Sequence, residues 1–345
     1  MLFELPSLEH VDAREVGDAV SWLRHYGKKA KIIAGGTDLL GLMKDRLTGQ
    51  EMPIPEVLIN VKTIPEMTRM VYDPEKGLSI GAAVTLNRLA TSDAAKGKYS
   101  ILSQAAQQVG TTPLRYMGTV GGNLCQRPRC LYFRHPHFSC FKKGGSRCYA
   151  LAGEHKYYHA ILEYGKCVMA HPSDMAPALI ALKAKVLIAG TEGNRDVPLE
   201  NFFLGPNHVE ETIIKPDELI TDIRIPSPSP GTLQVFLKHR IRHSADFALA
   251  SIALVGRMSG EVCDEIRIVL GGVAPFPYGA VGAEERIRGE RLNDGLISKA
   301  AETSMEKARP LPMNHYKVDL AKTLVKRALM SIRSLSNGNG SGKVF

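Results

Sequence analysis

The 345 residues exceed the usual size of one domain and are sufficient for two or three, each with its own hydrophobic core. Lysine and arginine outnumber aspartate and glutamate by 44 to 35, a net charge of +9. No arginine-rich run or aromatic-basic stripe accompanies this excess, so we expect no nucleic-acid partner. No basic leader with an apolar segment opens the sequence and no apolar stretch approaches the roughly 18 residues of a membrane span, so we expect a cytoplasmic protein without membrane segments.

Residues 1–60 have the pattern of a small α/β unit that we interpret as the first subdomain. Apolar residues at helical spacing predict a helix over Val11–Tyr26, and those from Leu39 to Leu47 mark one face of a second helix. Short apolar runs predict strands at Lys31–Ala34 and Val57–Val61.

Residues 61–226 form a second unit of mixed character. The pattern predicts strands at Gly77–Ala83 and Lys185–Ala189, and helices at Leu86–Ala90, Ile101–Val109 and Met175–Leu182. Residues 125–171 interrupt this pattern, because they are basic and contain several histidines and most of the cysteines. We interpret them as an inserted loop.

A Pro/Ser-rich break at 226–231 separates a third unit, residues 232–334. Strands are predicted at Leu233–His239 and Glu265–Leu270, and helices at Gly295–Ala308 and Val318–Ile332. Residues 335–345 are rich in glycine, serine and asparagine, so we expect a flexible tail.

Two glycine-rich segments, Ala34–Leu40 (AGGTDLL) and Thr119–Asn123 (TVGGN), are the candidate ligand site. Backbone N–H groups in such turns point at anions, and two turns suit a diphosphate, with the Thr37 hydroxyl as a further donor. Neither segment is a Rossmann turn or a P-loop. Either one alone is equally compatible with a tight turn that needs glycine.

The order of motifs resembles the FAD-binding medium subunit of the molybdenum hydroxylases (xanthine dehydrogenase family). The two glycine-rich segments are followed by Pro172-Ser173-Asp174-Met175, Phe236-Leu237-Lys238 and Leu270-Gly271-Gly272-Val273-Ala274. The resemblance covers most of the chain. It implies an α+β protein with a vanillyl-alcohol-oxidase-type (PCMH-like) FAD-binding fold of two subdomains, followed by a C-terminal α/β domain of the CO-dehydrogenase flavoprotein type.

The resemblance also implies which residues contact FAD. The two glycine-rich segments would surround the pyrophosphate and ribose, with Ser173 and Asp174 beside them and Leu219 and Lys238 near the isoalloxazine. From the residues alone, Asp174 is equally suited to cap the following helix, and Lys238 to be a surface lysine in a strand. The implied set is Ile33, Ala34, Gly35, Gly36, Thr37, Asp38, Leu39, Gly118, Thr119, Gly122, Asn123, Ser173, Asp174, Leu219 and Lys238.

Five cysteines lie in the inserted loop, and four of them have the spacing Cys130-x9-Cys140-x7-Cys148-x18-Cys167. Thiolates are ligands for zinc and for iron–sulfur clusters. The C-x-x-C pairs usual in both kinds of site are absent, so the spacing leaves the metal open. A group of free thiols is the alternative.

A subset of the family, typified by bacterial FAD-containing aldehyde oxidoreductase and 4-hydroxybenzoyl-CoA reductase, carries a four-cysteine insertion that holds a [4Fe-4S] cluster. The residues around Cys130 and Cys167 resemble the aldehyde-oxidoreductase type, which makes Cys130, Cys140, Cys148 and Cys167 the implied ligands and leaves out Cys125 and Cys263. We expect the histidines of the insertion, His135, His137, His155 and His159, on a solvated loop surface. The basic residues Arg127, Arg129, Arg134, Lys142, Lys143 and Arg147 are expected to stabilise the negative cluster.

By this resemblance the chain is an electron-transfer subunit that carries FAD and a [4Fe-4S] cluster. A molybdopterin-binding large subunit with the molybdenum cofactor and a small subunit with [2Fe-2S] clusters would be its partners, and a small-molecule or protein electron acceptor would react at FAD. Export of the complex to the periplasm by a partner stays open. The alternatives are a stand-alone FAD-dependent oxidoreductase of the same fold and a zinc-stabilised binding module without flavin.

Overall fold

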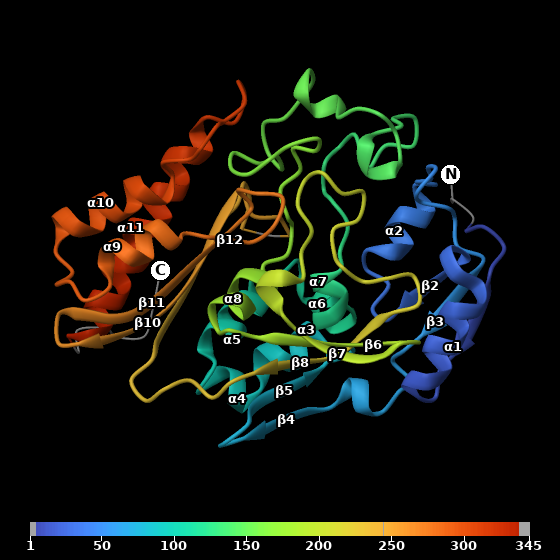
Figure 1. The fold of residues 1–345 in the computed structure, drawn as a ribbon, viewed down its shortest axis with the longest axis horizontal. Coiled ribbons are helices and arrows are strands. Elements are labelled where there is room, and N and C mark those ends of the chain that lie inside the picture. The colour runs from blue at the N-terminus through green and yellow to red at the C-terminus, as the bar shows by residue number, and fades with distance from the viewer. Residues whose placement is uncertain (1–4, 244, 338–345) are drawn as a thin grey trace.

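The protein, described from a computed structural model over residues 5–243 and 245–337, contains three β-sheets that follow one another along the chain. Figure 1 shows the N-terminal sheet at one end of the long axis and the C-terminal sheet with its helices at the other. The fold is therefore a mixture of helix and sheet, as the sequence predicts.

The first sheet has the strand order β1-β3-β2 and is parallel throughout. Its strands are β1 (Glu9–Asp12), β2 (Ala30–Ile33) and β3 (Val57–Asn60), and the central strand β3 is buried from Val57 to Ile59. Helix α1 (Val16–Tyr26) packs on it through Ala19 and Leu23. The short helix α2 (Leu39–Lys44) follows the glycine-rich turn after β2.

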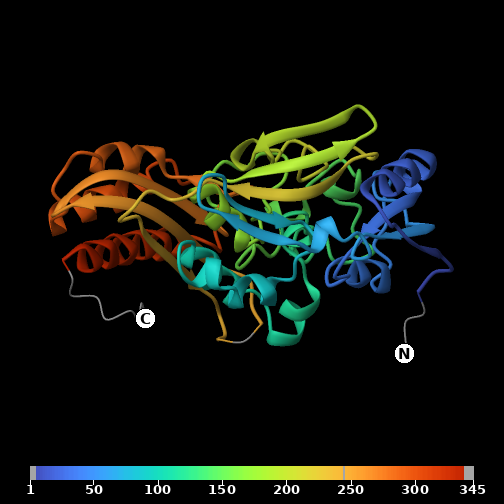
Figure 2. The same cartoon turned by 90° about the horizontal axis from the view of Figure 1, so that it is seen from below.

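The second sheet is antiparallel, with the order β4-β5-β8-β6-β7. Short helices pack on one of its faces, as Figure 2 shows for α3 to α5. The strands are β4 (Met70–Asp73), β5 (Gly77–Gly81), β6 (Lys185–Gly190), β7 (Gly193–Pro198) and β8 (Leu219–Ile225). The helices are α3 (Leu86–Thr91), α4 (Asp93–Lys96), α5 (Ser100–Gln107), α6 (Thr112–Met117), α7 (Val120–Leu124) and α8 (Met175–Ala181).

The third sheet lies between two layers of helices. Its order is β12-β11-β10-β9, with β9 (Leu233–His239), β10 (Ala250–Ser259), β11 (Val262–Gly271) and β12 (Tyr278–Gly279). In β10, Ile252 and Leu254 belong to the core shared with α9 (Val281–Ile287), α10 (Asp294–Ser304) and α11 (Tyr316–Ser336), whereas Ala253 belongs to the core of the second sheet. This alternation is the period of two expected for a strand buried on both faces.

The inserted loop, residues 125–171, contains turns, isolated bridges and two short 3-10 turns, Phe141–Lys143 and Tyr149–Leu151. Figure 1 shows it in green across the top of the molecule, between the N-terminal and C-terminal parts. Its apolar residues Tyr132, Phe133 and Val168 form a small core with Leu42 and Met52 of the first unit. The loop is thus packed against the protein and has an interior of its own.

Several predicted elements differ from the observed ones. The helix predicted from Val11 begins at Val16, because residues 9–12 pair with β3 and Glu15 and Asp18 form a capping box at the helix start. The helix predicted to end at Ala308 ends at Ser304, and α11 continues through Ser336 into the expected tail. Residues 338–345 of that tail lie outside the described residues. No helix within 5–243 or 245–337 is long and apolar enough to cross a membrane.

Candidate functional site

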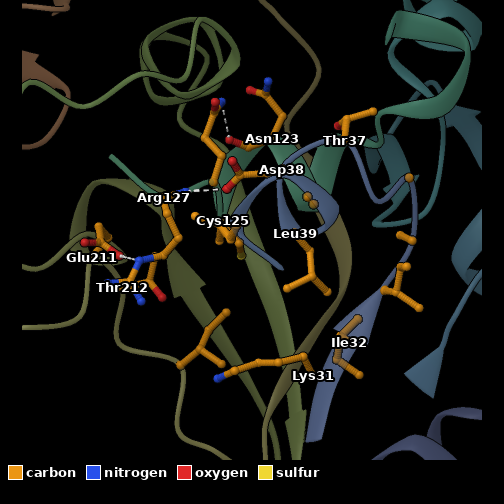
Figure 3. Close-up of a pocket in the computed structure, with 18 of the residues that line it drawn as sticks. Lys31, Ile32, Thr37, Asp38, Leu39, Asn123, Cys125, Arg127, Glu211 and Thr212 are labelled. Atoms are coloured by element: carbon orange, nitrogen blue, oxygen red, sulfur yellow. Dashed lines mark hydrogen bonds and ion pairs between the residues drawn. The ribbon is translucent and has the colours of Figure 1, made fainter. Parts of the chain in front are cut away.

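A cavity of about 870 Å³ lies among the first sheet, the second sheet and the start of the third, a size within the usual range of ligand pockets. Figure 3 shows Thr37 and Asn123 near one end of the cavity and Lys31 and Ile32 near the other. Fourteen of the fifteen residues expected at the cofactor line it: Ile33, Ala34, Gly35, Gly36, Thr37, Asp38, Leu39, Gly118, Thr119, Gly122, Asn123, Asp174, Leu219 and Lys238.

The two glycine-rich segments touch each other through their backbones. A Cβ atom placed on Gly35 would lie 2.7 Å from the Met117 carbonyl carbon and 2.8 Å from Gly118 Cα, so no side chain fits there. The next residue, Gly36, has a φ of 66°, which L-residues rarely adopt. Segments about 80 residues apart in sequence therefore form one continuous wall of the cavity.

The second segment is held by side-chain hydrogen bonds. Thr119 Oγ1 caps α7 by accepting from the Gly122 N–H at 3.2 Å. Ser173, the one expected residue that does not line the cavity, lies behind Asn123, and its hydroxyl donates to Asn123 Oδ1 at 2.6 Å. The Ser173 oxygen also accepts from the Ala176 N–H. The capping role considered for Asp174 thus belongs to Ser173.

Asp174 and Lys238 form a buried ion pair at the wall of the cavity. Lys238 Nζ lies 2.6 Å from Asp174 Oδ2, and the two side chains are 1 % and 4 % exposed. Lys238 also donates to the Gln108 carbonyl. Burial raises the pKa of Asp174, and the Lys238 ammonium partly offsets this rise. Lys238 is therefore not a surface lysine, and its charge is compensated.

Asp38 connects the first glycine-rich segment to the inserted loop. Its carboxylate lies 2.6 Å from Arg134 Nη2 and 2.8 Å from Arg129 Nη2, and it accepts from the Arg127 N–H at 2.8 Å. All three donors come from the inserted loop. The three arginines therefore fix Asp38, whereas the sequence predicts that they stabilise the negative charge of the cysteine cluster.

The four cysteines predicted as ligands lie in or next to the small apolar core described above. Cys130, Cys140 and Cys167 are buried, and Cys148 is partly buried. Backbone N–H groups act to lower the pKa of each thiol: those of Tyr132 and Phe133 at Cys130, Lys142 and Lys143 at Cys140, Ala150, Leu151 and Val168 at Cys148, and Met169 at Cys167. Such neighbours favour the thiolate over the thiol.

The charge environment of the thiols differs from one to the next. Burial raises the pKa of Cys130 to about 11, whereas the hydrogen bond from Cys167 lowers the pKa of Cys148 to about 6. Two buried lysines place cationic side chains near the thiols. Lys142, which is 2 % exposed, lies near Cys167, and Lys143, which is 0 % exposed, lies near Cys140. Arg147 lies instead over the Tyr149 ring. Of the six basic residues expected near the thiols, Lys142 and Lys143 are thus the two whose charges act on them.

The histidines of the insertion divide into two groups. His135 and His137 are exposed as expected, but His155 and His159 are buried, because the loop has a core that its polar composition does not reveal. Burial lowers the pKa of His159 to about 4, and the nearby Lys317 ammonium adds to this effect. Within the described part of the chain, no group of three or more His, Cys, Asp or Glu side chains is arranged to hold a metal ion.

Part of the cavity wall comes from residues that no sequence motif marks. Glu211 pairs with Arg127 Nε at 2.7 Å and lies 3.4 Å from Lys142, while Arg129 stacks on Phe247 of the third unit, 4.6 Å from the ring centroid. Glu211 and Phe247 also line the cavity. Neither residue lies in a motif, so only the tertiary structure brings them to the site.

Comparison with known families gives two matches along the chain. Residues 6–228 match the FAD binding domain in molybdopterin dehydrogenase, and residues 236–332 match the CO dehydrogenase flavoprotein C-terminal domain. Together these matches confirm the expected fold class.

Individual proteins are similar over nearly their whole length. The chain is 34 % identical to the aldehyde oxidoreductase FAD-binding subunit PaoB of Escherichia coli K12, over 88 % of this chain and 92 % of that protein. It is 29 % identical to the carbon monoxide dehydrogenase medium chain of Hydrogenophaga pseudoflava, over 94 % and 96 %. The solved structure of a Hydrogenophaga pseudoflava carbon monoxide dehydrogenase that lacks the Mo-pyranopterin moiety superposes with a TM-score of 0.76 at 27 % identity, covering 95 % of this chain and 97 % of that one.

Proposed function

Because this chain belongs to the FAD-binding medium subunits of the molybdenum hydroxylases, we propose that the cavity holds FAD and that the chain passes electrons between a molybdenum-bearing partner and an external acceptor or donor. When bound, FAD accepts electrons singly and releases them singly or in pairs. The observation that carries the proposal is the backbone contact of Gly35 with Met117 and Gly118, which joins two anion-binding turns into one wall of a cavity of suitable size.

The residues of this wall have separate roles in the proposal. The backbone of Ala34–Leu39 and of Gly118–Asn123 binds the pyrophosphate and ribose, since the first turn of each following helix has N–H groups without partners in the helix. Ser173 fixes the Asn123 amide through their 2.6 Å hydrogen bond. Leu219, Asp174 and Lys238 lie at the isoalloxazine. Because Asp174 offsets the Lys238 charge, the pair acts on the flavin as an oriented dipole.

We propose that the inserted loop holds a [4Fe-4S] cluster on Cys130, Cys140, Cys148 and Cys167. The support is chemical: backbone N–H groups act to lower the pKa of all four thiols, and two buried lysines lie near them. Four thiolates on one zinc ion would lie within about 4 Å of one another, since Zn–S bonds are about 2.3 Å long. A [4Fe-4S] cluster instead takes one thiolate on each iron, and four cysteines supply that number.

The partners proposed are a large subunit that binds the molybdenum cofactor and a small subunit with [2Fe-2S] clusters. The names of the relatives support them, because the carbon monoxide dehydrogenase proteins are medium chains and one solved complex is described by its molybdenum cofactor.

We further propose that the chain has three functional units. Residues 1–60 and residues 61–226 are two subdomains around FAD, and the second contains the insertion 125–171. Residues 232–334 are the flavoprotein C-terminal domain. One sheet lies in each of these ranges.

The purified chain, expressed with and without candidate partners, tests these assignments by its cofactor content. We expect one FAD, four irons and four acid-labile sulfides per chain, with flavin absorption and an EPR signal of a reduced cluster. Flavin without iron would remove the cluster assignment, and zinc without flavin would favour a binding module. Full turnover of an organic substrate by the chain alone would favour a stand-alone oxidoreductase.

A further inference from the structure

His159 contacts one of the proposed cluster ligands. His159 is 3 % exposed, and its Nε2 lies 3.3 Å from Cys130 Sγ, within hydrogen-bond distance for sulfur. Its other ring nitrogen, Nδ1, is also buried and has no hydrogen-bond partner of good geometry among residues 5–243 and 245–337, although the His155 carbonyl lies near enough to the ring to act on its pKa. Cys130 Sγ is thus the partner of Nε2.

The ligand role proposed for Cys130 decides which way this hydrogen bond runs. A neutral imidazole carries its proton on one nitrogen and a lone pair on the other. A cysteine sulfur bonded to iron is a thiolate, which carries no proton and can only accept. The imidazole proton thus belongs on Nε2, where it points at Cys130 Sγ.

We propose that His159 donates its Nε2–H to Cys130 Sγ and so raises the reduction potential of the cluster on the four cysteines. The inference rests on the cluster assignment made above. A hydrogen bond to a ligating sulfur stabilises the reduced cluster more than the oxidised one, because the reduced cluster carries more negative charge. His159 is a positioning and tuning residue and not a ligand.

The backbone around His159 holds the ring in place. His159 forms an antiparallel bridge with Met169, and the Ala160 N–H donates to the Val168 carbonyl at 2.8 Å. Lys317, whose residue is 0 % exposed, donates to the His159 carbonyl at 2.8 Å from helix α11. The same segment is therefore tied to the residues after Cys167 and to the C-terminal unit, so the donor is oriented before any cluster binds.

Three variants test the role of this donor by EPR-monitored redox titration. His159→Phe keeps a ring and removes the donor, and we expect its ratio of reduced to oxidised cluster at a fixed potential to fall about fivefold, the effect of one net hydrogen bond. His159→Gln keeps an N–H donor and should stay closer to the parent. His155→Gln is the matched control, because His155 is a buried histidine of the same loop that bonds to the Ala150 carbonyl and the Met313 N–H and to no sulfur.

A measurement on the parent chain covers the case in which His159→Phe does not fold. With ¹⁵N-labelled histidine, pulsed EPR of the reduced cluster should detect a weak coupling to one histidine nitrogen, as expected across a hydrogen bond. A strong coupling would make a histidine a direct ligand and overturn the inference. So would the absence of coupling, or an unchanged potential in His159→Phe with full iron content. A parent chain without iron overturns the cluster assignment itself, and with it this role of His159.

Discussion

Arg134 Nη2 lies 2.6 Å from Asp38 Oδ1, and both side chains are mostly buried, at 18 % and 17 % exposure. This ion pair joins the cysteine-bearing loop to the glycine-rich segment that lines the cavity. Arg129 contributes a second guanidinium to the same carboxylate at 2.8 Å. The proposed flavin and cluster sites are thus mechanically connected through one aspartate.

We expect Asp38→Asn to destabilise the protein by about 2 kcal/mol, because two mostly buried guanidiniums lose their counter-ion. Flavin retention should fall with stability, since the amide no longer fixes the first glycine-rich segment. Thermal unfolding and the flavin content after gel filtration measure both effects. Glu200→Gln breaks a more exposed pair with Arg267 and should change stability by less than about 1 kcal/mol. Equal effects of the two substitutions would refute a special role for Asp38.

Gly35→Ala should abolish or strongly weaken flavin binding. The added Cβ meets the backbone of Met117 and Gly118, which cannot move aside as a flexible side chain does, so the two segments must separate. Gly41→Ala, six residues further on in helix α2, is the control, because a Cβ there meets no atom within 4 Å. We expect Gly41→Ala to retain flavin and to gain about 0.5–1 kcal/mol of stability from helix propensity. Flavin titration by fluorescence quenching compares them.

The sequence predicts the site through motif order and misses most of what fixes it. The glycine-rich turns, the Pro172–Met175 helix start and the Lys238 strand can be found because each has a local signature. The partners of Asp38 and Lys238 lie about 90 and 64 residues away, so no local pattern indicates either ion pair.

The inserted loop shows the same limit in its histidines. Its polar composition predicts a solvated surface, yet Leu42, Leu47 and Met52 from the first unit supply apolar partners that bury part of it. Burial of His155 and His159 therefore depends on residues distant in sequence, which periodicity within the loop does not report.

Lys238→Met should make stability depend more steeply on pH. Burial already raises the pKa of Asp174, so the folded protein holds this proton to a higher pH than the unfolded chain does. The free energy of unfolding therefore falls as the pH rises from the Asp174 pKa in the unfolded chain, about 4, through its pKa in the folded protein. Without the Lys238 ammonium that pKa rises further, so the variant should lose more stability at pH 8 than at pH 5. Urea unfolding at both values measures this, and a pH-independent difference from the parent would argue against it.

Single Cys→Ser substitutions separate the proposed ligands from the other thiols. Cys140→Ser should lower the iron and sulfide content and remove the EPR signal, because serine oxygen is a poor substitute for a soft thiolate. Cys263→Ser is the buried control: its thiol lies in the core of the third unit, so the variant should lose some stability and keep its iron. Cys125→Ser should also keep the iron, although Cys125 lines the cavity proposed to hold flavin. If Cys125→Ser lost its iron and Cys140→Ser kept it, Cys125 and not Cys140 would be the iron ligand.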